Sequence, residues 1–173
     1  MGKAMKTEKG RRAIGAVKIT VIVVCLATVI ISATFFAVRS ILKAEFPMKY
    51  QDKISLYAET YGVPEDLLYG VIHTESGYDE KAKSHAGAIG LTQITPETFL
   101  WLQTKTGENL PEEALYDADT SVKYCAVFYG LLLKEFGGDE KTAIAAYHAG
   151  RGQVNAWLRD PDISPDGKTL VNI

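Results

Sequence analysis

Hydrophobic positions along this chain follow two patterns, one continuous run near the N-terminus and a helical spacing of three or four residues after it. Residues 19–38 are ITVIVVCLATVIISATFFAV, twenty residues without a charge between Lys18 and Arg39. A bilayer core of about 30 Å needs about 20 apolar residues in a helix, so this run predicts a single transmembrane helix. Its hydroxyl-bearing side chains are tolerable there because they can bond to the preceding turn.

A cleaved signal peptide is the alternative interpretation of this run. Signal peptides carry an apolar region of about 7–15 residues that ends in a small-x-small site. The run here is longer and ends Phe35-Phe36-Ala37-Val38, which favours an uncleaved anchor. Cys25 lies inside the run after bulky Val24, so it is interpreted as a membrane-buried hydrophobe rather than a lipid attachment site.

Beyond a short tether at residues 39–46, the spacing predicts an all-α domain over residues 47–173. Glycine and proline separate its helices, and no sustained period-two alternation or internal repeat occurs. The first helix shows one apolar face at Tyr50, Ile54, Tyr57 and Tyr61 and ends at Gly62. The others run from Pro64 to Gly77, from Pro96 (capped by Thr95) to Gly107, through Val122–Phe136 to Gly137, and from Asp139 to Gly150, with a last short one at Val154, Trp157 and Leu158.

Charge and cysteine content narrow the functional classes. Before residue 39, six basic side chains stand against Glu8 alone, a charge of +5, whereas the remainder has 13 basic and 20 acidic side chains, a charge of −7. The basic residues belong to the arm 1–18, so nothing in the main domain supports nucleic-acid binding. Cys125 is the only cysteine outside the apolar run, so the domain is not a disulfide scaffold and depends on its core.

Glu75 is the acidic residue whose surroundings indicate chemistry. It lies three, four and seven residues after Ile72, Val71 and Leu68, so it shares their helical face. It also falls in the last turn before Gly77, where the negative end of the helix dipole opposes a second negative charge. Burial and the dipole both favour the protonated form, which predicts a raised pKa and a general acid. The competing interpretation is an ordinary solvated glutamate at a helix end.

Three segments in order carry a resemblance to a known family. The segments are Glu75-Ser76, Gly87-Ala88-Ile89-Gly90-Leu91-Thr92-Gln93 and Ala145-Ala146-Tyr147-His148-Ala149-Gly150. Taken alone, the small residues at 86–90 could form a tight turn, and the third segment could be a closely packed helix end. Together they resemble the soluble lytic transglycosylase family, which shows Glu-Ser, Gly-Leu-Met-Gln and Ala-Tyr-Asn-Ala-Gly motifs on a goose-type, lysozyme-like fold. Ser84-His85-Ala86-Gly87-Ala88, Pro96 and Thr98 extend the resemblance, which runs from about Tyr50 to the chain end.

The resemblance implies cleavage of the β-1,4 bond between N-acetylmuramic acid and N-acetylglucosamine in peptidoglycan. Glu75 would protonate the leaving oxygen and then, as carboxylate, accept the proton of the muramoyl C6 hydroxyl, which closes a 1,6-anhydro ring. Ser76 would orient Glu75 or the sugar, and Gln93 would hydrogen-bond the glycan. Tyr147 would bond Glu75 through its phenol.

Three departures from the family pattern stand out. Thr92 occupies the position of the motif's usual Met and brings a small hydroxyl to the expected sugar contact. His148 replaces the usual Asn with a side chain of a type that titrates near neutrality. It either takes over the hydrogen bonds of the Asn or alters the pH response of the site. The alternative is a histidine at a helix end that interacts favourably with the helix dipole. The family domain commonly continues into a further helix, which the predicted domain lacks because this sequence stops at Ile173.

Two other functions remain open at this point. A hydrolytic muramidase on the same fold needs a second carboxylate about 5–9.5 Å from the first, and Asp79 and Glu80 are better explained as a solvated loop pair. The second open function is that of an inactive, membrane-tethered module that binds peptidoglycan. No Cys/His cluster has zinc spacing and no acidic loop has calcium spacing, so neither a metal nor an organic cofactor is expected.

The basic arm predicts the topology. Lys and Arg next to an apolar span are retained in the cytoplasm, which places everything after Arg39 outside the membrane. The expected partners are peptidoglycan glycan strands close to the membrane. This position suits wall remodelling, wall synthesis or the opening of a gap for a secretion or conjugation apparatus, and the sequence does not choose among them.

Overall fold

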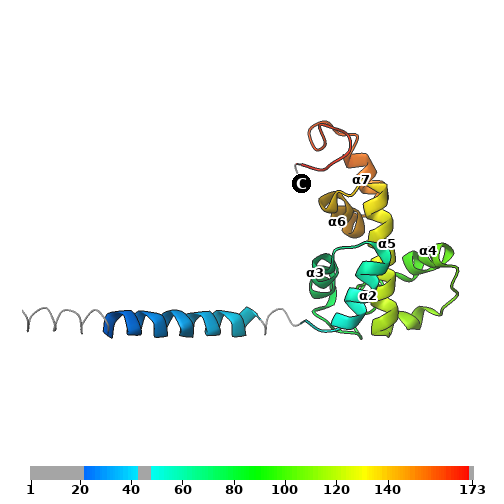
Figure 1. Ribbon diagram of the computed structural model, residues 1–173. Helices are drawn as coiled ribbons and strands as arrows, with labels where there is room; N and C mark the ends of the chain where they lie inside the picture. The colour runs from blue at the N-terminus through cyan, green and yellow to red at the C-terminus, as the bar shows by residue number, and fades with distance from the viewer. Residues whose placement is uncertain (1–21, 43–47, 172–173) are drawn as a thin grey trace, which may run out of the picture. The chain divides into compact units, whose positions relative to one another are not determined.

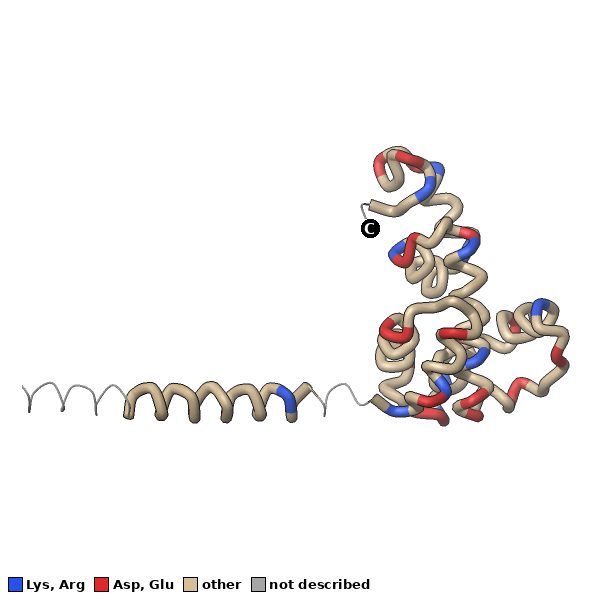
Figure 2. The backbone as a smooth tube through the Cα atoms, viewed as in Figure 1, with Lys and Arg blue, Asp and Glu red and all other residues tan. Residues whose placement is uncertain are grey.

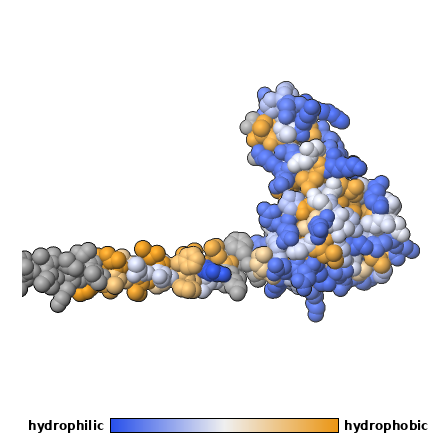
Figure 3. All heavy atoms as spheres, viewed as in Figure 1, coloured by the Kyte–Doolittle hydropathy of each residue, from blue (hydrophilic) through white to orange (hydrophobic). Residues whose placement is uncertain are grey.

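The computed structural model describes residues 22–42 and 48–171, which belong to two compact units, residues 1–47 and 48–173. In the first unit, one helix spans Ile22–Leu42, and its 21 residues are exposed along their whole length. It ends four residues later than predicted, and Arg39 is its only charged residue (Figures 2 and 3). The Thr28, Ser32 and Thr34 hydroxyls donate to carbonyls three or four residues earlier, as predicted.

By length and composition this helix is suited to cross a membrane, and a signal sequence near an N-terminus can have the same length and apolar composition. The predicted arm at residues 1–18, the start of the predicted span at residues 19–21 and the end of the predicted tether lie outside the described residues. The second unit begins at Met48, one residue after the predicted start of the domain.

The second unit is helical, as predicted, and its described residues contain no named strand (Figure 1). Helix α5 lies at its centre: ten of its 18 residues are buried, and it contacts α2, α3, α4, α6 and η1. Such burial follows from the apolar stripe that continues through Val122, Cys125, Tyr129 and Leu132. The elements are α2 Gln51–Tyr61, α3 Glu65–Ser76, α4 Pro96–Thr106, the 3-10 helix η1 Glu112–Tyr116, α5 Ala118–Glu135, α6 Glu140–Ala149 and α7 Arg151–Trp157.

The predicted caps are largely confirmed. The Thr95 hydroxyl accepts from the Thr98 amide at the start of α4, and the Asp139 carboxylate accepts from the Thr142 amide at the start of α6. Pro64 is the N-cap of α3 rather than its first residue, a difference of one position. Left-handed glycines at the predicted positions 62, 77 and 107 end α2, α3 and α4.

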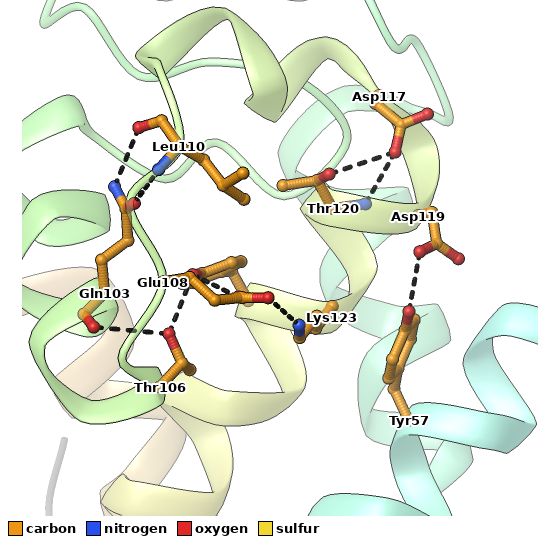
Figure 4. Close-up of polar contacts among 10 residues, drawn as sticks. Tyr57, Gln103, Thr106, Glu108, Leu110, Asp117, Asp119, Thr120 and Lys123 are labelled. Carbon is orange, nitrogen blue, oxygen red and sulfur yellow. Dashed lines mark hydrogen bonds and ion pairs between the residues drawn. The ribbon is translucent and has the colours of Figure 1, made fainter.

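A close approach of α2 to α5 depends on Gly130. A Cβ at this position would lie 2.9 Å from the Tyr61 carbonyl oxygen, so only glycine leaves the present helix separation unstrained. Polar contacts fix the same pair of helices. Asp119 accepts from the Tyr57 hydroxyl at 2.7 Å (Figure 4). It also pairs with Lys53 at 3.0 Å.

The connection between α4 and α5 is held by side chains rather than by regular structure. Gln103 bonds the backbone N–H and C=O of Leu110, and Glu108 accepts from Lys123 and from Tyr124, each at 2.7 Å (Figure 4). Helix η1 contacts α5, and its Leu115 carbonyl lies so close to Gly90 of the loop before α4 that a Cβ there would be 2.0 Å away.

Candidate functional site

Glu75 lies in the last turn of α3, on the face that carries the buried side chains of Leu68, Val71 and Ile72. The Glu75 side chain is 19% exposed to solvent, so it is mostly buried but still accessible. Burial raises the pKa of Glu75, and the nearby His148 lowers it to a smaller extent. The predicted direction of the shift is confirmed, with burial as its main cause. A carboxyl in this state suits general-acid chemistry.

His148 is the polar group that meets Glu75. It lies in the last turn of α6, and its Nδ1 is 3.1 Å from Oε1 of Glu75. The imidazole remains 46% exposed while it contacts the carboxyl. His148 therefore both contacts Glu75 and occupies a helix end, so each of the two interpretations of this residue stays a prediction.

Ser76 ties the end of α3 to the following loop. Its hydroxyl lies 2.8 Å from the Leu91 carbonyl and 3.2 Å from the Ile72 carbonyl. Because a hydroxyl has one hydrogen, it donates to the nearer Leu91 or shares its hydrogen between the two. Ser76 therefore fixes the loop beside Glu75, which is an indirect form of the predicted orienting role.

Thr92 corrects the prediction of a sugar contact. Its side chain is completely buried and contacts the Ser121 hydroxyl at 3.0 Å. The loop turns this residue into the core, because the flanking Leu91 and Ile94 are buried as well. The predicted contact between the Thr92 hydroxyl and the substrate is therefore wrong in this structure.

Tyr147 has a different hydrogen-bond partner in the structure. Its phenol donates its single hydrogen to the Thr92 carbonyl at 2.6 Å, so a bond with Glu75 would have the phenol oxygen as acceptor. The ring is stacked on Tyr129, with centroids 4.6 Å apart and planes 9° apart, and this packing directs the hydroxyl toward the loop. Burial, followed by smaller effects of Cys125, Tyr129 and Glu75, raises the pKa of Tyr147. Tyr147 thus ties α6 to the loop, and its predicted bond to Glu75 stays a prediction.

Gln93 adopts a left-handed backbone, with φ 50°, at the end of this loop. Its amide nitrogen donates to the carbonyls of Gly90, at 3.0 Å, and of Ala82, at 3.2 Å. Both amide hydrogens are used in this way, so Oε1 is the atom that can bind a ligand, as an acceptor. The predicted glycan contact is compatible with an acceptor only.

A pocket of about 360 Å³ next to the Glu75–His148 pair was missed by the sequence analysis. Its walls come from α3 and α6, which are far apart in sequence, and Tyr129 contributes a buried hydroxyl without a hydrogen-bond partner. The lining residues are Asp66, Leu67, Gly70, Val71, Thr74, Tyr129, Glu140, Ile144 and His148. The apolar stripe of α3 was visible in the sequence, but its pairing with α6 was not.

The other acidic candidates have structural roles. Glu80 accepts from the Tyr50 hydroxyl at 2.9 Å, and Asp79 accepts from the Lys81 amide at 2.9 Å. Within residues 22–42 and 48–171, no group of three or more His, Cys, Asp or Glu side chains is arranged to hold a metal ion. The site thus brings together a carboxyl whose pKa is raised by burial and an imidazole in contact with it.

Comparison with known families gives a match to the transglycosylase SLT domain over residues 52–168. The chain is 30% identical over 120 residues to the soluble lytic murein transglycosylase of Escherichia coli strain K12, a match that covers 68% of this chain and 18% of that protein. It is also 30% identical over 116 residues to the membrane-bound lytic murein transglycosylase C of Haemophilus influenzae strain PittEE, covering 61% of this chain and 32% of the relative.

Solved structures give the same result. The lytic transglycosylase Slt of Pseudomonas aeruginosa, solved as an inactive mutant, superposes with a TM-score of 0.66 and 29% identity over 69% of this chain and 20% of that one. The 70-kDa soluble lytic transglycosylase of Escherichia coli superposes with a TM-score of 0.68 and 27% identity over 71% and 20% of the two chains. The chain thus spans about a fifth of the length of these relatives, in the region that contains the candidate site.

Proposed function

Because the chain belongs to the transglycosylase SLT domain family, we propose that it is a peptidoglycan lytic transglycosylase with Glu75 as its single acid and base. The substrate is the β-1,4 bond between N-acetylmuramic acid and N-acetylglucosamine. The product is a glycan strand that ends in 1,6-anhydro-N-acetylmuramic acid.

In the proposed reaction, protonated Glu75 gives its proton to the glycosidic oxygen, and the bond from this oxygen to the muramoyl anomeric carbon breaks. The resulting carboxylate accepts the proton of the C6 hydroxyl, whose oxygen closes on the anomeric carbon. Glu75 ends the cycle protonated, and no water is consumed. A carboxyl whose pKa is raised by burial supports the first step, because it holds its proton at higher pH than an exposed glutamate.

One observation carries this proposal: the carboxyl of Glu75 is mostly buried and lies 3.1 Å from the imidazole of His148. A hydrolytic mechanism of the usual kind needs two carboxyls about 5–9.5 Å apart, and the acidic residues that follow Glu75 in sequence, Asp79 and Glu80, are engaged in bonds to the Lys81 amide and the Tyr50 hydroxyl. The Slt neighbour, for which a glutamate-to-glutamine mutant is described as inactive, supports the same assignment by analogy.

The test is digestion of purified peptidoglycan by the full chain in detergent, followed by mass spectrometry of the released muropeptides. We expect products that lack one water relative to reducing ends, loss of this activity in Glu75→Gln, and retention in Glu113→Gln, a control at an exposed glutamate of η1. Ordinary reducing ends would replace this proposal with a hydrolytic muramidase. No release at all, with wild type and Glu75→Gln both sedimenting with peptidoglycan, would replace it with a binding module.

We also propose that the helix Ile22–Leu42 anchors the enzyme, with the basic N-terminal arm in the cytoplasm and the helical domain outside. The similarity to a relative named as membrane-bound supports an anchor. Tags at the two ends provide the test. Both tags should remain in the carbonate-washed membrane fraction, and external protease should remove only the C-terminal one. Loss of the N-terminal tag from a soluble product would indicate a cleaved signal sequence instead.

A further inference from the structure

The contact between His148 and Glu75 joins two groups that can exchange one proton. Nδ1 of His148 and Oε1 of Glu75 are 3.1 Å apart, close enough for a proton on either atom to decide the charge of both. If the proton moves from Glu75 to neutral His148, the pair becomes carboxylate and imidazolium, and no other bond changes. In that form Glu75 has no proton to give to a glycosidic oxygen.

The groups around the pair leave His148 as the main titrating partner of Glu75. Cys125 and Tyr129 of α5 and Tyr147 of α6 face the carboxyl, and burial raises the pKa of all three thiol and phenol groups, to about 12 for Cys125. These three side chains therefore stay neutral near neutral pH.

Two other acidic side chains lie near the pair. Asp66 of α3 and Glu140 of α6 line the pocket that His148 also lines.

We propose that His148 is a positioning residue whose contact with Glu75 favours the carboxylate form, so that glycan cleavage is confined to a more acidic range than Glu75 alone would give. This inference rests on the proposed function, in which cleavage starts from protonated Glu75. Asparagine, the usual residue of the family motif at this position, cannot take up a proton. The substitution by histidine therefore adds a charge that responds to pH.

The first experiment compares pH profiles of anhydro-product release by the full chain in detergent micelles. In His148→Asn, the alkaline midpoint of the profile should rise by about 0.5–1 pH unit, because the pair is partly solvent-exposed and the shift is at the low end for opposite charges in contact. His148→Lys keeps a positive charge and should retain the acidic midpoint or lower it further. His85→Asn removes an exposed histidine and should leave the midpoint unchanged.

The second experiment observes the pair without catalysis. The chain has three histidines, so NMR titration of labelled imidazoles in the full chain can be assigned with the single variants. If the two groups are coupled, Glu75→Gln should change the pH dependence of the His148 resonance, whereas the other two histidines should be unaffected. The same spectra show whether each variant is folded.

The outcomes separate the two proposals. A midpoint in His148→Asn equal to that of wild type, or a His148 titration unaffected by Glu75→Gln, would overturn the ion-pair inference even if anhydro products form. If the titrations are coupled and no variant forms anhydro products, the pairing stands and the transglycosylase proposal fails, and with it the effect on cleavage.

Discussion

Gly90 is the residue at which one added methyl group should do the greatest damage to the site. Its φ of 74° is left-handed, and a Cβ there would lie 2.0 Å from the Leu115 carbonyl oxygen of η1. The Gly90 carbonyl also accepts from the Gln93 side chain at 3.0 Å. Gly90→Ala would therefore push the loop away from η1 and disturb the residues that lie beside Glu75.

The magnitude follows from two separate costs. A left-handed non-glycine residue costs about 1–2 kcal/mol. Ordinary Cβ contacts begin near 3.4 Å, so the 2.0 Å approach requires backbone movement of more than an ångström, at about 2–3 kcal/mol or more. Together they amount to about 3–5 kcal/mol, or a fall in Tm of about 10–20 °C for a domain of this size.

Gly87 supplies a matched control in the same loop. Its φ is 82°, and a Cβ there meets no atom within 4 Å, so Gly87→Ala should have only the cost of a left-handed backbone at a non-glycine residue. Its Tm should fall by only about 4–8 °C. The difference between the two variants isolates the contact with Leu115.

Tryptophan fluorescence is the appropriate assay for the full chain in micelles. The two tryptophans, Trp101 and Trp157, lie in α4 and α7, so their signal reports on the helical domain and not on the helix Ile22–Leu42. Activity at a temperature where both variants remain folded should be lower for Gly90→Ala. Equal melting temperatures for Gly90→Ala and Gly87→Ala would refute the claim that the loop is packed against η1 at this distance.

Three further predictions concern the core and the site. Since burial raises the pKa of Glu75, Glu75→Gln should be more stable than wild type at pH 8, with a difference that shrinks as pH falls through the folded pKa and vanishes below the unfolded one; denaturant unfolding at several pH values checks this sign. Gly130→Ala should lower stability by about 1–3 kcal/mol, measured in the same way, because its Cβ would meet the Tyr61 carbonyl. Thr92→Val should lower the free energy of unfolding by about 1–3 kcal/mol, because the Ser121 hydroxyl loses its side-chain partner. The KM should be unchanged. A raised KM would contradict the buried position of Thr92 and support a contact with the sugar.

Local signals allowed most of the helices to be predicted from the sequence. Thr95 and Asp139 cap through bonds to amides three residues away, and Gly77 ends a helix because of its own backbone freedom. The same local rule applies to Asp117, which caps α5 through the Thr120 amide, and this signal was overlooked. The 3-10 helix at 112–116 is too short to show a hydrophobic period.

The site residues also differ in whether a local sequence signal could predict their contacts. The partial burial of Glu75 follows from its place in the stripe of its own helix, so its raised pKa was predictable. The partners of Tyr147 and His148 are set by how α6 meets α3 and the loop, which no local pattern encodes. The Tyr147 phenol donates to the Thr92 carbonyl, 55 residues away in sequence, while its ring stacks on Tyr129, and neither contact is visible in a local pattern.

The burial of Glu75 places stability and the proposed catalysis in opposition. Each reduction of its exposure raises its pKa and so keeps it protonated at higher pH, but also increases the free energy lost when it ionises in the folded protein. A neighbouring imidazole offsets part of this cost, because the ion pair with His148 compensates the buried negative charge. The compensation acts only while the imidazole is protonated, and that is also the form that holds Glu75 without its proton. If this account is correct, His148→Asn should be less stable than wild type at the pH where Glu75 is ionised and His148 is charged, and the stability difference should disappear once Glu75→Gln is introduced as well. Additive effects of the two substitutions would show that the pair is not coupled in the folded protein.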